Sequence, residues 1–408
     1  MEFKEKTLAN GLAIIGEVNK SAKSAAVGFF VRTGSRDETE QVNGVSHFLE
    51  HMLFKGTEKL GALEVNEAFD RTGAQYNAFT SEENTVFYAA VLPEYLAEVT
   101  GLWIELMRPA LREEDFNIEK NVIKEEIAMY KDVPSFDVMD RCRRLHFEAH
   151  PCGNSVLGSE TSINGLTAEQ MRNYFVRRYA PNNMVLACAG NFEWEQICSV
   201  VEEGCGNWQV QDAGRKLESF GGSKKRDRLE KANLSLEHIC LMSAGVSAQD
   251  SRRFAGALLA EIIGDDVGSR FFWELVDKAL AETATMQFGA MDGTGAFYSY
   301  IRCGRENVVS VLDTVRAIFQ KLAEKGINED ELRKAKNKIL SALVLKNELP
   351  MGRLVDLGSN WVYLKQYRTV AEDISAIKAV TVDDVHSLIE ELNPGDFTQF
   401  SIGPAQSG

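Results

Sequence analysis

One short stretch near the N-terminus decides how the rest of the chain is interpreted: His47-Phe48-Leu49-Glu50-His51. The apolar residues in and around it recur at helical spacing, so we expect a single helix that stops by Gly56. On this helix His47 and His51 lie one turn apart, and both imidazoles leave the same face. Glu50 lies about 100° from His51 around the axis, close enough to reach a water held by the histidines. Two imidazoles and a nearby carboxylate suit a catalytic zinc site, which keeps a fourth position open for water.

The same five letters also fit a helix that merely carries two surface histidines. Two observations favour a metal site over this alternative. The chain has only six histidines, and two of them share this turn. A third ligand is also available, because Glu119 and Glu126 lie two turns apart on one face of a helix predicted over 113–131.

Carboxylates on helices are usually solvated, so the Glu119 and Glu126 pair alone would be an ordinary surface feature. We expect Val122 to lie on the same side, which makes this face partly apolar and gives an acid there a reason to be buried. Glu125 points elsewhere and is expected to be solvated. His146 and His150 are also four residues apart, but no carboxylate is placed to help them, so they are the weaker metal candidate.

Length and composition narrow the class of protein. The 408 residues are too many for one ordinary core, and the formal net charge of −15 disfavours nucleic acid as a partner. The acidity fits basic peptide substrates or plain solubility equally well. No apolar run reaches the roughly 18 residues that span a bilayer, and no signal peptide is visible, so we expect a cytoplasmic protein with no membrane partner. Seven cysteines without paired spacing predict reduced, mostly buried thiols.

The second half of the chain repeats the first weakly, as shown by Pro134 and Pro350, which occupy matching positions 216 residues apart. The fold class is therefore predicted as α+β, with two homologous domains. Each would have a mostly antiparallel sheet with helices packed on one face. We expect a first domain over 1–213, a polar linker over 214–232 and a second domain over 233–408. The second copy has no H-x-x-E-H, and Ala342 stands where Glu126 stands in the first, so only the first half can build this metal site.

The first half of the chain resembles the pitrilysin/insulinase metallopeptidases. It is most similar to the short bacterial members related to the mitochondrial processing peptidase beta subunit. The resemblance covers about residues 7–195, and the second half is similar more loosely near 251–254. The segments that carry it are 8–12, 34–38, 47–57, 77–81, 119–129 and 179–184.

The resemblance implies a role for each candidate residue. It implies one Zn²⁺ per chain bound by His47, His51 and Glu126, with Glu50 as general base. It implies that Glu119 supports catalysis without binding the metal. The match of Asn77, Ala78 and Phe79 implies an edge strand that pairs with the backbone of a peptide substrate. The ligand set would also suit manganese or cobalt.

One departure from the family pattern lies in the second half. Relatives carry an Arg and a Tyr in a stretch like L-R-E-K-R-G-L-A-Y-S, which helps to bind substrate and oxyanion. Here the matching residues 275–284 are one shorter, with Val276 in the Arg place and Glu282 in the Tyr place. The family forms a clamshell in which the first domain of one chain faces the second domain of its partner.

The resemblance thus implies a zinc-dependent endopeptidase that cleaves short or unfolded peptides in an enclosed chamber. It would be one subunit of a homodimer, or of a heterodimer whose homologous partner supplies the Arg/Tyr pair. The alternative is a non-catalytic structural or peptide-binding subunit derived from the same family. The missing pair favours this alternative, whereas the intact set of two histidines and two glutamates favours catalysis.

Overall fold

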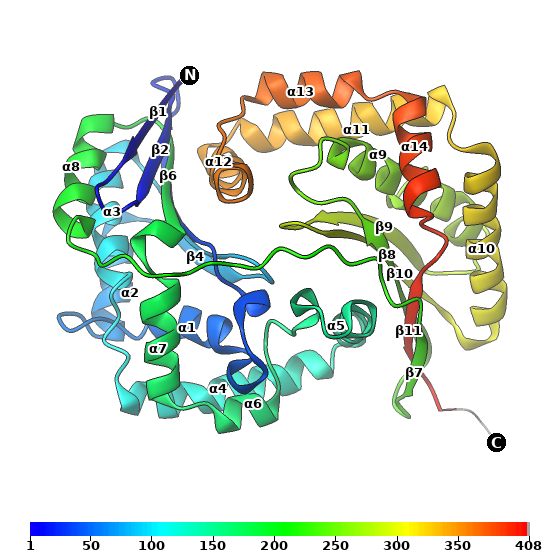
Figure 1. The fold of residues 1–408 in the computed structure, drawn as a ribbon, viewed down its shortest axis with the longest axis horizontal. Coiled ribbons are helices and arrows are strands. Elements are labelled where there is room, and N and C mark those ends of the chain that lie inside the picture. Colours follow the sequence, from blue (N-terminus) through cyan, green and yellow to red (C-terminus); the bar gives the residue numbers. More distant parts are fainter. Residues whose placement is uncertain (406–408) are drawn as a thin grey trace. The chain divides into compact units, whose positions relative to one another are not determined.

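A computed structural model describes residues 1–405, and the chain forms two compact units (Figure 1). Unit 1 contains residues 1–127, 154–215 and 344–368, and unit 2 contains 128–153, 216–343 and the chain from 369 onward. Each unit therefore contains a segment from the other half of the sequence. The predicted domain boundaries at 213 and 233 concern the two repeats along the sequence, whereas each compact unit contains segments from both repeats. These boundaries stay a prediction.

Unit 1 is built on a six-stranded sheet. Its spatial order is β1 (Glu2–Thr7), β2 (Ala13–Val18), β6 (Met184–Gly190), β3 (Ala25–Val31), β5 (Thr85–Val91) and β4 (Gln75–Thr80). Every pairing is antiparallel except that of β2 with β6. Strand β3 is buried along its whole length, as its continuous apolar run predicts. Strands β1 and β2 form a hairpin whose connection contains Asn10 and Gly11.

Unit 2 repeats this arrangement with five strands. Their order is β7 (Arg226–Glu230), β11 (Thr398–Gly403), β8 (Leu236–Gly245), β10 (Gly295–Gly304) and β9 (Thr283–Ala290). The one parallel pairing, β7 with β11, corresponds to β2 with β6, and unit 1 has the additional strand β1 outside that pair. The matching strand order confirms two copies of one α+β design. Residues 226–230 lie within the predicted linker yet form a strand, so the connecting segment is shorter than predicted.

In unit 1 the helices gather on one face of the sheet, as predicted, and one further helix covers the other. The helices are α1 (Val45–Leu53), α2 (Ala62–Thr72), α3 (Leu96–Leu106), most of α4 (Glu113–Lys131), α6 (Glu160–Gly165), α7 (Ala168–Arg178) and α8 (Trp194–Cys205). The opposite face packs against α12 (Pro350–Leu364), which comes from the second half of the sequence. Arg353 of α12 forms a buried ion pair of 2.8 Å with Glu17 of β2.

Unit 2 mirrors this packing with a helix from the first half. One face of its sheet packs against α9 (Arg253–Gly264), α10 (Val308–Lys325) and α14 (Val382–Leu392). The remaining helices of the second half are α11 (Glu329–Asn347) and α13 (Val370–Ala379). The other face packs against α5 (Pro134–Phe147), where Val138 and Cys142 meet Cys240 and Met242. We call α5 and α12 the exchanged helices, and both begin with the matching prolines.

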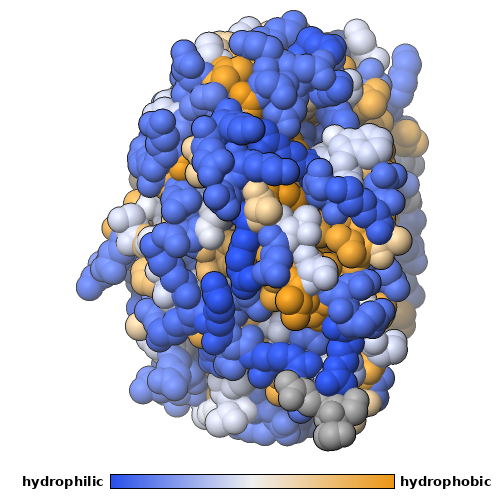
Figure 2. Space-filling model, turned by 90° about the vertical axis from the view of Figure 1, so that its right-hand side faces the viewer, coloured by the Kyte–Doolittle hydropathy of each residue, from blue (hydrophilic) through white to orange (hydrophobic). Residues whose placement is uncertain are grey.

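The surface and the thiols agree with the composition. Figure 2 shows that the face carrying α10 is mostly hydrophilic, with small hydrophobic patches between the charged groups. All seven cysteines are free and buried, as predicted. Among the residues that the structure describes, no helix combines the length and the apolar character needed to cross a bilayer.

Candidate metal centre

The start of α1 is fixed so that its histidines face inward. Gly44 precedes the helix with φ of +94°, and a Cβ there would lie 2.7 Å from the carbonyl oxygen of Leu157. Only glycine fits this left-handed and crowded position. The Glu38 carboxylate accepts hydrogen bonds from the backbone N–H groups of Gly44 (2.6 Å) and Ser46 (2.7 Å). An acid at a helix N-terminus satisfies otherwise unpaired donors, and here it anchors the turn that carries His47.

His47, His51 and Glu126 come together although Glu126 is far along the sequence. One ligand atom from each lies within 4.8 Å of the others. Glu126 Oε2 is 3.7 Å from His47 Nε2 and 3.5 Å from His51 Nε2. Zinc bonded at about 2.0–2.2 Å places tetrahedral ligand atoms roughly 3.3 Å apart, so these separations suit a shared ion. Among residues 1–405 this is the one group of three such side chains.

The polar atoms around this point also fit a metal. Glu126 Oε2 is buried and has no hydrogen-bond partner among the described residues, although it points at two imidazoles. Burial, followed by the charge of His51, lowers the pKa of His47 to about 3. His47 is therefore a neutral imidazole, which is the form that binds metal. Burial raises the pKa of Glu126 above its usual value and outweighs the opposing charge of His51.

His51 is oriented by an acid on the far side of its ring. Glu119 is only 3% exposed and accepts a hydrogen bond of 2.8 Å from His51 Nδ1. This bond assigns the proton to Nδ1 and leaves Nε2 free to face Glu126. Burial works to lower the pKa of His51, but the hydrogen bond to Glu119 and the nearby carboxylates raise it overall. Lys55 forms an ion pair of 2.5 Å with Glu119.

Sequence reasoning gave no role to Lys55, although a signal was present. Lys55 follows His51 by four residues, so a continuous helix would place both side chains on one face. Lys55 and His51 together hold the pKa of Glu119 below its usual value, against the opposing effect of burial. The ionised Glu119 can thus hold the His51 proton in place.

Glu50 lies beside this trio and is held by a residue that sequence reasoning also missed. Thr80 Oγ1 donates a hydrogen bond of 2.5 Å to Glu50 Oε2. Thr80 is the last residue of β4, and no regular pattern along the chain links it to a helix residue 30 positions away. Burial raises the pKa of Glu50. A carboxylate with a raised pKa is better suited to take and return a proton near neutral pH.

Strand β4 carries the predicted substrate contacts and lies at the edge of its sheet. Asn77 and Phe79 are exposed, and Ala78 is buried. An edge strand presents unpaired backbone groups, so an extended peptide could pair with it. The substrate-binding roles of the three residues stay predictions.

The inner face of α4 differs from the prediction at one residue. Val122 is 42% exposed, so the expectation that it shares the buried face is wrong. The buried positions next to Glu119 are instead Phe116, Ile123 and Ile127, which follow the spacing of a helix face centred on that acid. Glu125 is exposed, as expected.

The weaker candidate pair has structural partners instead of a metal. His146 Nδ1 lies 3.1 Å from Thr398 Oγ1, and His150 Nε2 lies 3.0 Å from the carbonyl oxygen of Glu218. Burial lowers the pKa of His146 to about 4. Within residues 1–405 no third ligand joins these histidines.

Residues 275–284 of unit 2, which differ from the expected pattern, include an acid that contacts the neighbouring strand. Glu282, in the place of the family's Tyr, forms an ion pair of 3.0 Å with Arg302 on β10. Tyr300 lies two residues before Arg302, and its hydroxyl is 2.7 Å from His238 Nδ1. Alternation along a strand puts Arg302 and Tyr300 on the same face of the sheet. A guanidinium and a phenol therefore occur near Glu282, at positions other than those that the resemblance implies.

Comparison with known proteins identifies the family that the sequence resembles. A profile of the insulinase family, peptidase family M16, matches residues 13–160, and a profile of the peptidase M16 inactive domain matches 165–339. An uncharacterized zinc protease of Bacillus subtilis, YmxG, is 31% identical over 99% of this chain and 98% of its own. The probable mitochondrial-processing peptidase subunit beta of Arabidopsis thaliana is 26% identical over 99% of this chain and 79% of its own. The crystal structure of a protease from Helicobacter pylori matches with a TM-score of 0.91 over 99% of both chains at 21% identity, which shows a shared fold.

Proposed function

The chain belongs to the insulinase family of peptidases, family M16, and from this premise we propose that it is a zinc-dependent endopeptidase. The observation that carries the proposal is the convergence of His47, His51 and Glu126, with Glu50 beside them. Two imidazoles and a carboxylate form a three-ligand set, and catalytic zinc sites use three protein ligands and keep one position open.

Each residue of the site has a distinct task in this proposal. A bound zinc would polarise the scissile carbonyl and lower the pKa of its water. Glu50 takes the proton from that water and returns it to the leaving amine. Thr80 holds the Glu50 carboxylate, and Glu119 holds the His51 ring. Asn77, Ala78 and Phe79 would align the peptide along the edge of β4.

The proposed substrates are short or unfolded peptides. Pairing with an edge strand needs an extended backbone, which a folded protein rarely offers. The family resemblance adds an enclosed chamber and a partner, either a second copy or a homologous subunit. Arg302 and Tyr300 favour a homodimer, because this same sequence then supplies the guanidinium and the phenol that Val276 and Glu282 do not.

The second candidate is a non-catalytic structural or peptide-binding subunit, favoured by the absence of the family's Arg and Tyr at 276 and 282. Against it stands the buried pairing of Glu119 with His51 and Lys55, which a scaffold without chemistry does not need.

The test combines metal content with peptide cleavage. The purified chain is assayed for zinc and for cleavage of a quenched fluorescent peptide, alone and with a homologous subunit. Glu50→Gln should abolish cleavage while zinc stays bound. Glu125→Gln is the control for Glu50→Gln, because it makes the same chemical change at an exposed glutamate of helix α4. Zinc with no cleavage in either setting would overturn the peptidase proposal in favour of the second candidate.

The same assay separates the two kinds of dimer. Cleavage by the chain alone, lost in Arg302→Gln but not in Arg305→Gln, supports a homodimer that uses its own arginine. Cleavage only after the homologous subunit is added supports a heterodimer.

A further inference from the structure

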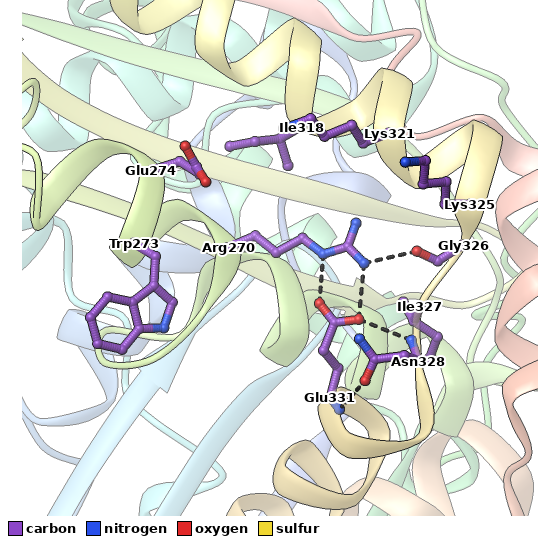
Figure 3. A pocket seen from close by; sticks show the side chains of 10 residues that line it. All are labelled: Arg270, Trp273, Glu274, Ile318, Lys321, Lys325, Gly326, Ile327, Asn328 and Glu331. Carbon is purple, nitrogen blue, oxygen red and sulfur yellow. Dashed lines mark hydrogen bonds and ion pairs between the residues drawn. The ribbon is translucent and has the colours of Figure 1, made fainter.

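Unit 2 contains a pocket of about 430 Å³ that includes none of the candidate metal-site residues. It lies between the helical turn Phe272–Val276, helix α10 and the segment 326–328 that leads into α11 (Figure 3). Pockets that bind small molecules in proteins are typically about 300–1,000 Å³. The pocket is therefore large enough for a ligand of a dozen or so heavy atoms.

One wall is an arginine whose orientation is fixed. Arg270 donates from Nε to Glu331 Oε1 (2.8 Å) and from Nη2 to Glu331 Oε2 (3.0 Å). Nη2 also donates to the carbonyl oxygen of Gly326 (2.8 Å). Nη1 has no hydrogen-bond partner among residues 1–405, and Figure 3 shows a terminal nitrogen pointing away from Glu331 toward α10. A guanidinium anchored on one side and free on the other is preorganised to bind an anion.

Two exposed lysines add positive charge to the pocket, and the charge of Lys321 also acts on Glu274. Lys321 and Lys325 lie one turn apart on α10, and neither forms an ion pair with a described residue. The two acids that line the pocket are already engaged, Glu331 with Arg270 and Glu274 with Lys278 (2.5 Å). Three cationic and two acidic side chains thus line the pocket, which leaves its lining with a net positive charge in a chain whose net charge is −15. An anion between them would relieve their mutual repulsion.

The rest of the pocket is apolar. Ile318 and Ile327 are each 4% exposed and contribute to its floor, while Trp273 is 53% exposed at its side. An exposed indole offers a large flat surface that gains free energy when a ring covers it. Charge at one end and an aromatic face at the other define the shape of the ligand.

We propose that this pocket binds a small organic anion in which a phosphate or carboxylate group is attached to an aromatic ring. The anionic group contacts Arg270 Nη1, Lys321 and Lys325, and the ring stacks on Trp273. This inference does not depend on the peptidase activity, because no residue of the pocket belongs to the candidate metal centre.

Calorimetric titration of the full chain tests it. The probes are phenyl phosphate and benzoate, with inorganic phosphate as the charge alone and benzyl alcohol as the ring alone. We expect at least one aromatic anion to bind with a Kd at least about tenfold lower than either partial probe. Comparison of phenyl phosphate with benzoate then identifies which anionic group the pocket prefers.

Substitutions of residues that line the pocket test whether the aromatic anion binds there. Lys321→Gln with Lys325→Gln should raise the Kd of the aromatic anion at least about tenfold. Lys334→Gln is the matched control, since Lys334 is an exposed lysine of α11 paired with Asp330. Trp273→Leu should weaken the aromatic anion and leave inorganic phosphate unchanged.

Three results would overturn the proposal. The first is no saturable binding of either aromatic anion up to about 5 mM. The second is binding that the lysine double variant does not weaken. The third is inorganic phosphate binding as tightly as phenyl phosphate, which would remove the role of Trp273. Zinc content measured on every variant shows that the chain has folded.

Discussion

Thr80→Val isolates what the hydrogen bond to Glu50 contributes to the proposed reaction. Valine keeps the branched shape of threonine and replaces the Oγ1 hydroxyl, which donates at 2.5 Å to Glu50 Oε2, with a methyl group. A hydrogen bond to a charged group is worth about 1.5–3 kcal/mol. If this energy holds Glu50 in its reactive orientation, kcat/KM should fall about 10- to 100-fold, at about 1.4 kcal/mol per factor of ten.

The assay is steady-state cleavage of a quenched peptide, with zinc content and unfolding by urea measured on the same samples. The loss should appear mainly in kcat, because the bond orients the base and does not bind the substrate. Thr80→Ser, which keeps the hydroxyl, should recover most of the activity. Activity of the valine variant within twofold of the parent would refute the reasoning. A loss of zinc or of stability equal to the loss of activity would also refute it, since Thr80 would then have a general structural role.

Three further predictions concern other contacts of unit 1. Glu119→Gln should weaken zinc binding about 10- to 100-fold, measured by competition with a chelator, because His51 loses its ionised partner; unchanged affinity would contradict this role. Arg353→Ala should destabilise the chain by about 3–5 kcal/mol in urea unfolding, because the buried charge of Glu17 loses its ion pair and keeps only the hydrogen bond from Tyr367; a cost below about 1 kcal/mol would argue against it. Burial raises the pKa of Glu38 from 4.5 to about 7, so its contribution to stability is full below about pH 4.5 and is lost as the pH rises through 7. Glu38→Gln should remove up to about 3 kcal/mol of this pH dependence, and an unchanged pH profile of unfolding would rule it out.

The sequence is most informative where structure is local. The bounds of α4, Glu113–Lys131, match the predicted range, and the bounds of β3, Ala25–Val31, coincide with one apolar run. Both follow from apolar periodicity over a single element, which the side chains themselves determine. The candidates for the metal group follow from the same local spacing, since His47 and His51 share one turn and Glu119 and Glu126 share one helix face. The choice of Glu126 as the ligand came from the family resemblance.

What the sequence did not reveal depends on packing between distant segments. An amphipathic helix does not specify which sheet it covers, so nothing local indicates that α5 and α12 are exchanged between the units. Strand β7 reads Arg-Asp-Arg-Leu-Glu, which resembles a solvated connector. It is nonetheless a strand, because an outermost strand needs to bury little and charged side chains protect its free edge.

The two copies of the long helix support the proposal that Glu119 of α4 serves the site and not the fold. Helices α4 and α11 have the same length and begin 216 residues apart, so Glu119 corresponds to Ala335 and Glu126 to Ala342. Ala335 and Glu119 are both 3% exposed, which means that the same position is buried in both copies. A carboxylate buried without a partner costs several kcal/mol, whereas alanine there costs nothing comparable. The second copy, which has no H-x-x-E-H, packs the helix with alanine. The first copy keeps Glu119 buried because His51 and Lys55 compensate its charge. Removal of His51 should therefore destabilise the first unit through Glu119, and Glu119→Ala in the same chain should restore part of that loss.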